Sequence, residues 1–114
     1  MIVGPCAAGK TTLVNGLKAR GIQARQIAQE HSYVPNMWRR LSRPDVLIFL
    51  EASFERCTER KRLSWSRSEY LEQLRRLADA REHCHIYINS DSLTPEEVLA
   101  EALDGLRRVR PEGT

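Results

Sequence analysis

The feature of this chain that most constrains its fold is an eight-residue stretch near the N-terminus, Gly4-Pro5-Cys6-Ala7-Ala8-Gly9-Lys10-Thr11. It matches the pattern G-x-x-x-x-G-K-[ST] and follows an apolar start, Ile2-Val3. From Lys10 to Arg20 the apolar side chains recur with the spacing of an amphipathic helix, at Leu13, Val14 and Leu17. Gly21 stands where a helix would end. The stretch therefore predicts a strand, a tight turn and a helix in immediate succession.

A turn of this kind binds phosphate, because its backbone N–H groups point inward and the following helix adds its positive end. We expect Lys10 to reach the outer phosphates of a nucleoside triphosphate, and Thr11 to complete the coordination of a magnesium ion that keeps most of its waters. Gly9 spares the phosphates a neighbouring Cβ. The residues expected to hold the nucleotide are Gly4, Pro5, Cys6, Ala7, Ala8, Gly9, Lys10, Thr11 and Thr12.

Length and composition favour one domain, residues 1–114, since 114 residues can enclose one core but not two. Hydrophobic residues at 41% and charged residues at 29% are ordinary globular values and argue against disorder. The longest apolar run, Val46 to Leu50, is too short to cross a bilayer, and no signal segment precedes the loop at Gly4. Three cysteines without metal-ligand spacing fit reduced thiols. We therefore expect a cytoplasmic protein without a membrane partner.

The first half of the chain predicts two further strands. Ile22 to Ala28 has the mixed polarity of an edge strand and ends in the polar cluster Gln29-Glu30-His31-Ser32. Residues 33–44 indicate a loop with one or two helical turns at Met37 to Leu41. Asp45 to Glu51 contains five consecutive apolar residues and is the best candidate for a central strand covered on both faces.

The second half predicts helices around one more strand. A helix carrying Arg56, Arg60, Lys61 and Arg62 comes first, and Ser66-x-x-Glu69 is the capping-box pattern of a helix that runs to His83. Ile86-Tyr87-Ile88 is a short last strand, and Thr94-Pro95-Glu96-Glu97 opens a final helix. Strands alternating with helices predict an α/β fold of three layers, with a short, mostly parallel sheet of about four strands between helices.

Taken together, these features resemble the nucleoside and nucleotide kinase-like branch of the P-loop proteins, which contains the thymidylate, deoxynucleoside, adenylate and shikimate kinases. The resemblance implies binding of Mg²⁺ and ATP, lid roles for Arg56, Arg60 and Arg62 around the transferring phosphoryl group or the base, and an adenine near Ser90 to Leu93. Three stretches, about half of the chain, carry it: Gly4 to Thr12, Pro44 to Ser53 with Glu55, Arg56 and Arg60, and Ile86 to Asp91 with Leu93 to Val98.

The chain departs from this family between its second strand and the Pro44-Asp45 strand, where such kinases usually insert an acceptor-binding segment and another strand. Only residues 29–44 remain here. The acceptor site is therefore small, borrowed from another subunit, or absent. The acidic group that the missing strand usually supplies must also come from elsewhere, and Glu30 is the first choice for holding magnesium through water or for accepting a proton from the acceptor hydroxyl.

Several side chains stay open to more than one interpretation. Glu51 also follows a strand and is the alternative partner of magnesium. His31 is either a base or orienting group for the acceptor or an ordinary loop histidine. Neighbouring side chains at a helix-to-strand junction diverge, so His83-Cys84-His85 does not predict a metal site. The remaining basic and aromatic candidates either bind acceptor or base, or form ion pairs and core contacts: Arg39, Arg40, Arg43, Trp38 and Trp65.

The sequence thus predicts a minimal kinase-like enzyme that transfers the terminal phosphoryl group of a magnesium-bound nucleotide to a small acceptor. The alternative is a nucleotide-binding or slowly hydrolysing regulatory module in which residues 29–44 form a switch or partner surface. The lid arginines favour the kinase, and the short acceptor segment favours the module. The arginines form no continuous basic stripe, which argues against nucleic acid, and the missing Asn-Lys-x-Asp guanine signature favours ATP over GTP.

Overall fold

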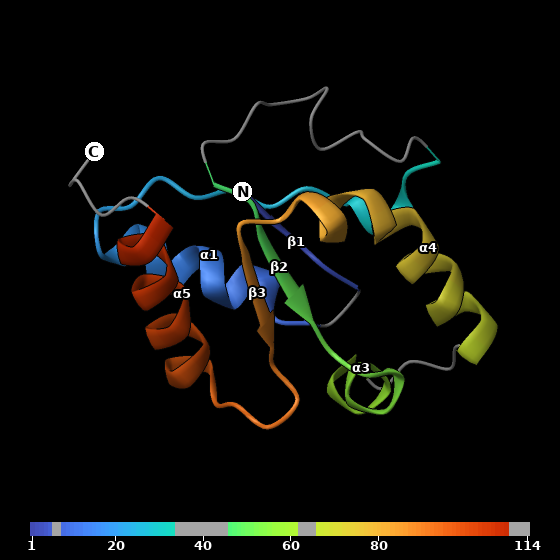
Figure 1. The fold of residues 1–114 in the computed structure, drawn as a ribbon. Helices are drawn as coiled ribbons and strands as arrows, with labels where there is room; N and C mark the ends of the chain where they lie inside the picture. The colour runs from blue at the N-terminus through green and yellow to red at the C-terminus, as the bar shows by residue number, and fades with distance from the viewer. Residues whose placement is uncertain (6–7, 34–45, 62–65, 110–114) are drawn as a thin grey trace.

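The fold is that of a computed structural model, which describes residues 1–5, 8–33, 46–61 and 66–109. Its described part is an open parallel β-sheet with helices packed around it (Figure 1). The strands are β1 (Ile2–Val3), β2 (Ile48–Glu51) and β3 (Ile86–Asn89). The helices are α1 (Lys10–Ala19), α3 (Phe54–Lys61), α4 (Arg67–His83) and α5 (Pro95–Val109), with a short 3₁₀ helix, η1 (Gln29–His31), after α1.

The three strands lie in the order β1-β2-β3, and both neighbouring pairs are parallel. Ile48 of β2 stands in register with Ile2 of β1 and with Ile86 of β3. Parallel neighbours cannot be joined by a tight hairpin, so the chain crosses over through helices between them. All three strands therefore end at the same edge of the sheet, which is the edge that the loop at Gly4 enters.

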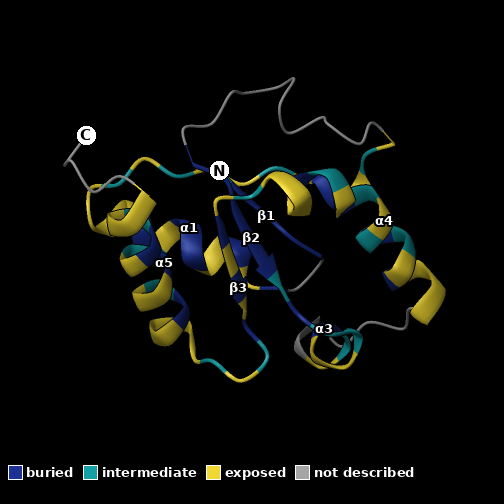
Figure 2. Cartoon of the chain, in the orientation of Figure 1, coloured by how far each residue is buried: buried dark blue, intermediate teal, exposed yellow. Residues whose placement is uncertain are grey.

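Alternate residues of β2 pack on opposite faces of the sheet, because successive side chains of a strand point in opposite directions. Ile48 and Leu50 pack with buried residues of α1 and α5, whereas Phe49 packs with Leu77 and Ala80 of α4. Figure 1 shows α1 and α5 on one face of the sheet and α4 on the other. Figure 2 shows the consequence: the strands β1 and β2 are buried, and the helices expose only their outer sides. The predicted α/β class, with an open parallel sheet and helices packed against it, is confirmed.

The prediction of a strand at Ile22 to Ala28 is wrong. This segment contacts β1 only through an isolated parallel bridge between Ile2 and Gln26, with the Ile2 N–H donating to the Arg25 carbonyl at 2.9 Å. Ile22, Ala24 and Ile27 are partly buried against the core, so the segment packs through its side chains, but its backbone pairs with β1 at this one bridge only. The polar cluster after it forms η1. The described sheet therefore has three strands instead of about four.

The predicted helix ends are largely confirmed. Ser66 caps α4 in a reciprocal capping box with Glu69, and Thr94 and Glu97 exchange the same pair of bonds at α5, at 3.2 and 2.8 Å. Gly21, at φ +78°, follows α1 and donates its N–H to the Lys18 carbonyl. These signals act over three or four residues, which is why the sequence alone identified them.

Several predictions fall on residues that the structure does not describe. They include the helical turns at Met37 to Leu41, Asp45 at the start of the predicted central strand, and the side chains of Trp38, Arg39, Arg40, Arg43 and Trp65.

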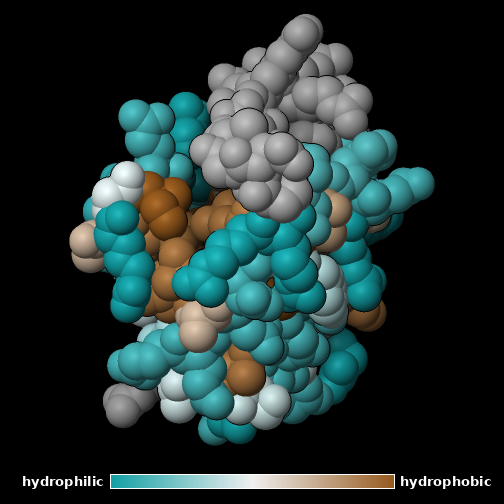
Figure 3. All heavy atoms as spheres, turned by 60° about the vertical axis from the view of Figure 1, so that its left-hand side comes forward, coloured by the Kyte–Doolittle hydropathy of each residue, from teal (hydrophilic) through white to brown (hydrophobic). Residues whose placement is uncertain are grey.

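Among the described helices, none is long and apolar enough to cross a membrane. Figure 3 brings the side of α1 and α5 forward and shows a hydrophobic area, with smaller hydrophobic spots apart from it, among mostly hydrophilic residues.

Candidate functional site

The loop after β1 requires glycine at two positions, Gly4 and Gly9, for two different physical reasons. A Cβ on Gly4 would lie 2.1 Å from the backbone oxygen of Leu50, so only glycine lets β1 run this close to the end of β2. Gly9 has φ +99°, in the left-handed region that other residues adopt at a cost. These two positions fix where the loop leaves the sheet and where α1 begins, as the motif predicts. Cys6 and Ala7, between them, lie outside the described residues.

The first turn of α1 has no side-chain cap. Its N-cap residue is Gly9, no cap hydrogen bond forms there, and the first turn has no acidic side chain. The helices α4 and α5, by contrast, close their first turns with capping boxes. The leading N–H groups of α1 therefore have no acceptor from a capping side chain, and together with the helix dipole they form a place where an anion is stabilised.

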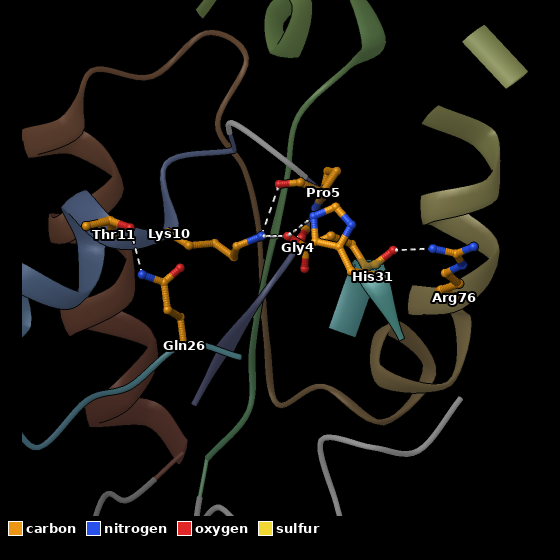
Figure 4. A network of polar contacts seen from close by, with 8 residues as sticks. Gly4, Pro5, Lys10, Thr11, Gln26, His31 and Arg76 are labelled. Carbon is orange, nitrogen blue, oxygen red and sulfur yellow. Dashed lines mark hydrogen bonds and ion pairs between the residues drawn. The ribbon is translucent and has the colours of Figure 1, made fainter. Parts of the chain in front are cut away.

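Lys10 lies at the centre of a buried polar network (Figure 4). Its Nζ donates to the carbonyl of Gly4 at 2.6 Å, to the carbonyl of Pro5 at 3.3 Å and to Oε2 of Glu30 at 2.6 Å. The Lys10 and Glu30 side chains are only 9% and 5% exposed. An ammonium group has three protons to donate, and each of them here has an acceptor. The ammonium is thus held at the loop by two loop carbonyls and one carboxylate.

Glu30 is fixed in this network from both its side chain and its backbone. Glu30 belongs to η1, and its backbone carbonyl accepts a hydrogen bond of 3.4 Å from the Arg76 guanidinium of α4. The side-chain amide of Gln29 donates to the Arg76 backbone carbonyl at 3.1 Å. The second carboxylate oxygen, Oε1, is buried and has no hydrogen-bond partner among the described residues. His31 is half exposed, with Nε2 3.9 Å from Oε2 of Glu30. The structure therefore brings Lys10, Glu30 and His31 together.

Thr11 faces a residue that the sequence did not single out. Its Oγ1 accepts a hydrogen bond of 2.6 Å from Nε2 of Gln26, and Figure 4 shows the Gln26 side chain extending toward Thr11. Gln26 is the residue that bridges Ile2 of β1. Its sequence neighbourhood gives no motif, so only the fold reveals it as a neighbour of the loop.

A cavity of about 200 Å³ opens beside the loop on the side of α5. Its wall is mainly apolar, and the hydroxyl of Ser90 in that wall donates to the Ala8 carbonyl at 3.2 Å, which ties the end of β3 to the loop. Thr12, predicted to touch the nucleotide, is part of the wall. The lining residues are Ala8, Gly9, Thr12, Leu13, Ser90, Leu93, Pro95 and Val98.

Glu51, the alternative acid, is engaged elsewhere. Its Oε2 accepts from the Tyr87 hydroxyl at 2.6 Å, and its Oε1 lies 3.8 Å from Nε of Arg81 in α4. Burial, and then the Glu51 hydrogen bond, raise the pKa of Tyr87 above its ordinary value. Glu51 thus points with Phe49 toward the α4 face of the sheet, while Lys10 is held by Glu30. The structure associates the loop lysine with Glu30 and not with Glu51.

The predicted lid arginines are only partly described. Arg56 is exposed on α3, and its guanidinium lies 3.8 Å from Glu59 on the same helix. The Arg60 side chain and the whole of Arg62 lie outside the described residues. Helix α3 is held to α4 by Glu55 and Arg67, 2.8 Å apart, and the hydrogen bond from Arg67 lowers the pKa of Glu55. The structure does not bring Arg56 into contact with Lys10 or Glu30.

The histidines near Cys84 have separate hydrogen bonds. His83 Nδ1 contacts the Asp79 carbonyl at 2.8 Å, whereas His85 Nδ1 accepts from the Leu47 N–H at 2.9 Å. Within the described part of the chain, no group of three or more His, Cys, Asp or Glu side chains is arranged to hold a metal ion.

Comparison of the chain with family models, with curated proteins and with solved structures found no match.

Proposed function

We propose that the chain is a minimal P-loop phosphotransferase that binds a magnesium-bound nucleoside triphosphate, ATP in the first place, and transfers its terminal phosphoryl group to a small acceptor. The observation that carries the proposal is the combination, at one end of β1, of an uncapped helix N-terminus with the buried ammonium of Lys10. Neither feature alone defines a nucleotide site, but both favour the same ligand chemistry, a polyanion.

Binding of phosphate requires Lys10 to exchange a partner, because all three of its protons have acceptors. The partner that it exchanges in this proposal is Oε2 of Glu30, since a phosphate oxygen carries the same kind of charge-assisted hydrogen bond. Nucleotide binding then releases the Glu30 carboxylate beside the terminal phosphate. Glu30 is thereby available as a base for the acceptor hydroxyl, with His31 next to it.

The residues around the loop fit magnesium. Magnesium prefers oxygen ligands, keeps several waters, and is usually bound through one or two protein groups together with substrate phosphates. Thr11 offers a hydroxyl, and Glu30 offers a buried carboxylate oxygen, Oε1, that has no partner among the described residues. When bound, the ion would neutralise charge that develops on the transferring phosphoryl group. Thr11 would contact it directly, and Glu30 through water.

The apolar cavity next to the loop supports a place for the base. Ala8 and Gly9 of the loop line it on one side, and Ser90 and Leu93 line it on the other, within the stretch where the family resemblance puts the adenine. The Ser90 hydroxyl is used within the protein, so the base would be held mainly by apolar contact. Reduced thiols at Cys57 and Cys84 fit the reducing cytoplasm that we propose as the location of the protein.

A second candidate function is the nucleotide-binding or slowly hydrolysing regulatory module. The position of Glu30 favours this function. If Lys10 leaves Glu30 for a phosphate oxygen, nucleotide binding is coupled to η1, which contains Glu30, and through Arg76 to α4. In this version the released η1 changes a partner surface, and no acceptor is bound. Arg56, Arg60 and Arg62 keep the lid role in the kinase version only.

Calorimetric titration with a magnesium-bound, non-hydrolysable ATP analogue tests the nucleotide site. Lys10→Ala is expected to weaken binding by about tenfold or more, since a charge-assisted contact is worth about 1.5 to 3 kcal/mol. Lys18→Ala, at the exposed end of the same helix, is the matched control and should bind like the unmodified chain. Equal affinities for all three proteins, or no binding by any of them, would refute the proposal. Phosphate release from ATP, measured with and without a panel of small alcohols, separates transfer from hydrolysis.

A further inference from the structure

Gln26 is held in place by the backbone of β1. The Ile2 N–H donates to the carbonyl of the preceding residue, Arg25, at 2.9 Å, and Gln26 itself forms the isolated bridge with Ile2. Because β1 continues directly into the loop at Gly4, the backbone of Gln26 is fixed relative to that loop. Its exposed side chain crosses from this bridge to the first turn of α1 and donates to Oγ1 of Thr11 at 2.6 Å.

The contact removes a freedom that a helical threonine otherwise has. In a helix, the Thr side chain divides between two rotamers, because its hydroxyl can also bond to a carbonyl of the preceding turn. A hydroxyl has one proton to donate and two lone pairs with which to accept. The Gln26 amide uses one lone pair and thereby favours the rotamer in which the Thr11 hydroxyl faces Gln26. The other lone pair remains for a cation, and the proton remains for a neighbouring oxygen.

We propose that Gln26 is a positioning residue that holds the Thr11 hydroxyl in the orientation for coordinating magnesium; this inference rests on the proposed function. Gln26 touches neither the nucleotide nor the ion in this role and acts only through Thr11. The Gln26 amide is neutral and contributes no charge to the ion. In this proposal the phosphates and Glu30 balance the charge of the ion. The chain thereby separates two tasks, orientation by Gln26 and charge by Glu30.

An ordinary surface hydrogen bond between Gln26 and Thr11 would have a different signature. It would change stability, or nucleotide affinity, to the same extent with and without magnesium. Orientation of a metal ligand instead changes only the gain in nucleotide affinity that magnesium provides. That gain, the ratio of affinities with magnesium chloride and with EDTA, is therefore the quantity to measure. Calorimetry with a non-hydrolysable ATP analogue gives both affinities for each variant.

Gln26→Leu is expected to lower the magnesium-dependent gain about fivefold, which corresponds to one lost hydrogen bond, and to leave the affinity in EDTA unchanged. Gln23→Leu, at an exposed position of the same segment, should keep the full gain. Gln26→Glu should restore it, because a carboxylate at the same position accepts the Thr11 proton and adds negative charge for the ion. Melting without ligand is expected to be similar for all of these variants, since the altered side chains are exposed.

The outcomes separate the two proposals. If the unmodified chain binds the analogue equally well with and without magnesium, or if Gln26→Leu keeps the full gain, the role of Gln26 is refuted while nucleotide binding stands. If Gln26→Leu loses affinity to the same extent in EDTA and in magnesium chloride, the positioning role is also refuted. The contact between Gln26 and Thr11 is then a structural hydrogen bond only. Absence of binding by the unmodified chain refutes the proposed function and this inference together.

Discussion

The buried pair of Lys10 and Glu30 allows a quantitative prediction that needs no ligand. Replacing Lys10 with Met removes an ammonium that makes contacts of 2.6, 3.3 and 2.6 Å, and it leaves the Glu30 carboxylate buried without its partner. Breaking one side of a buried ion pair costs about 3 to 5 kcal/mol, because an uncompensated charge remains in the interior. We therefore expect Lys10→Met to lower the free energy of unfolding by about 4 kcal/mol.

Replacing both partners should cost much less. In Lys10→Met combined with Glu30→Met no charge is left buried, and the remaining loss is the donor to the Gly4 and Pro5 carbonyls, about 1 to 2 kcal/mol. Urea unfolding followed by circular dichroism measures both variants. At a slope of about 1.3 kcal/mol per molar urea, the single variant would unfold at a midpoint lower by about 3 M. The double variant would recover about half to three quarters of this shift.

Lys18→Met provides the control, since Lys18 is exposed at the other end of α1 and should change stability by no more than about 0.5 kcal/mol. The reasoning is refuted if the double variant is no more stable than Lys10→Met. It is also refuted if Lys10→Met behaves like Lys18→Met, because the ammonium would then contribute no more than a solvent-exposed one.

Two further predictions follow from single contacts. Gly4→Ala should destabilise the fold by more than about 3 kcal/mol in the same urea assay, because its Cβ would lie 2.1 Å from the Leu50 carbonyl oxygen. Gly21→Ala, where nothing lies within 4 Å, should cost only the strain of its positive φ, about 1 to 2 kcal/mol. Equal losses of stability in the two variants would contradict this prediction. Burial raises the pKa of Tyr70 from 10.0 to about 12. The stability from this shift is complete below about pH 10 and lost as the pH rises toward about 12, so the melting temperature should fall more steeply in that range for the unmodified chain than for Tyr70→Phe. Parallel melting curves against pH would show that Tyr70 does not carry the effect.

The elements that the sequence predicted correctly are those with local signals. The capping boxes at Ser66 and Thr94 each need two residues three positions apart, and Gly21 needs only the turn before it. The strand predictions succeeded at Ile48 to Leu50, where both faces are apolar and buried, and at Ile86 to Ile88, where the two isoleucines are buried and Tyr87 is exposed. They failed at Ile22 to Ala28, because a segment of mixed polarity becomes a strand only if its neighbours supply backbone partners along its length, and here β1 supplies one bridge.

The candidate site divides in the same manner. The pattern from Gly4 to Thr11 predicted a turn after β1, the start of α1 and the place of Lys10 beside that turn. The choice of Glu30 over Glu51 came from its place after the expected second strand. That choice agrees with the ion pair to Lys10, although the segment before Glu30 is not a strand. Gln26 and Arg76 gave no signal in the sequence, since a single amide or guanidinium has meaning only beside its partner.

By itself, then, the sequence determined where the loop leaves β1 and where the helices begin and end, because glycine conformation, capping and helical periodicity act between residues a few positions apart. The tertiary structure alone decided which side chains meet there. Glu30 reaches Lys10 across twenty positions, and Gln26 reaches Thr11 across fifteen, because the bridge to Ile2 brings their segment alongside β1. Such distances depend on the packing of whole elements, for which a local pattern carries no information.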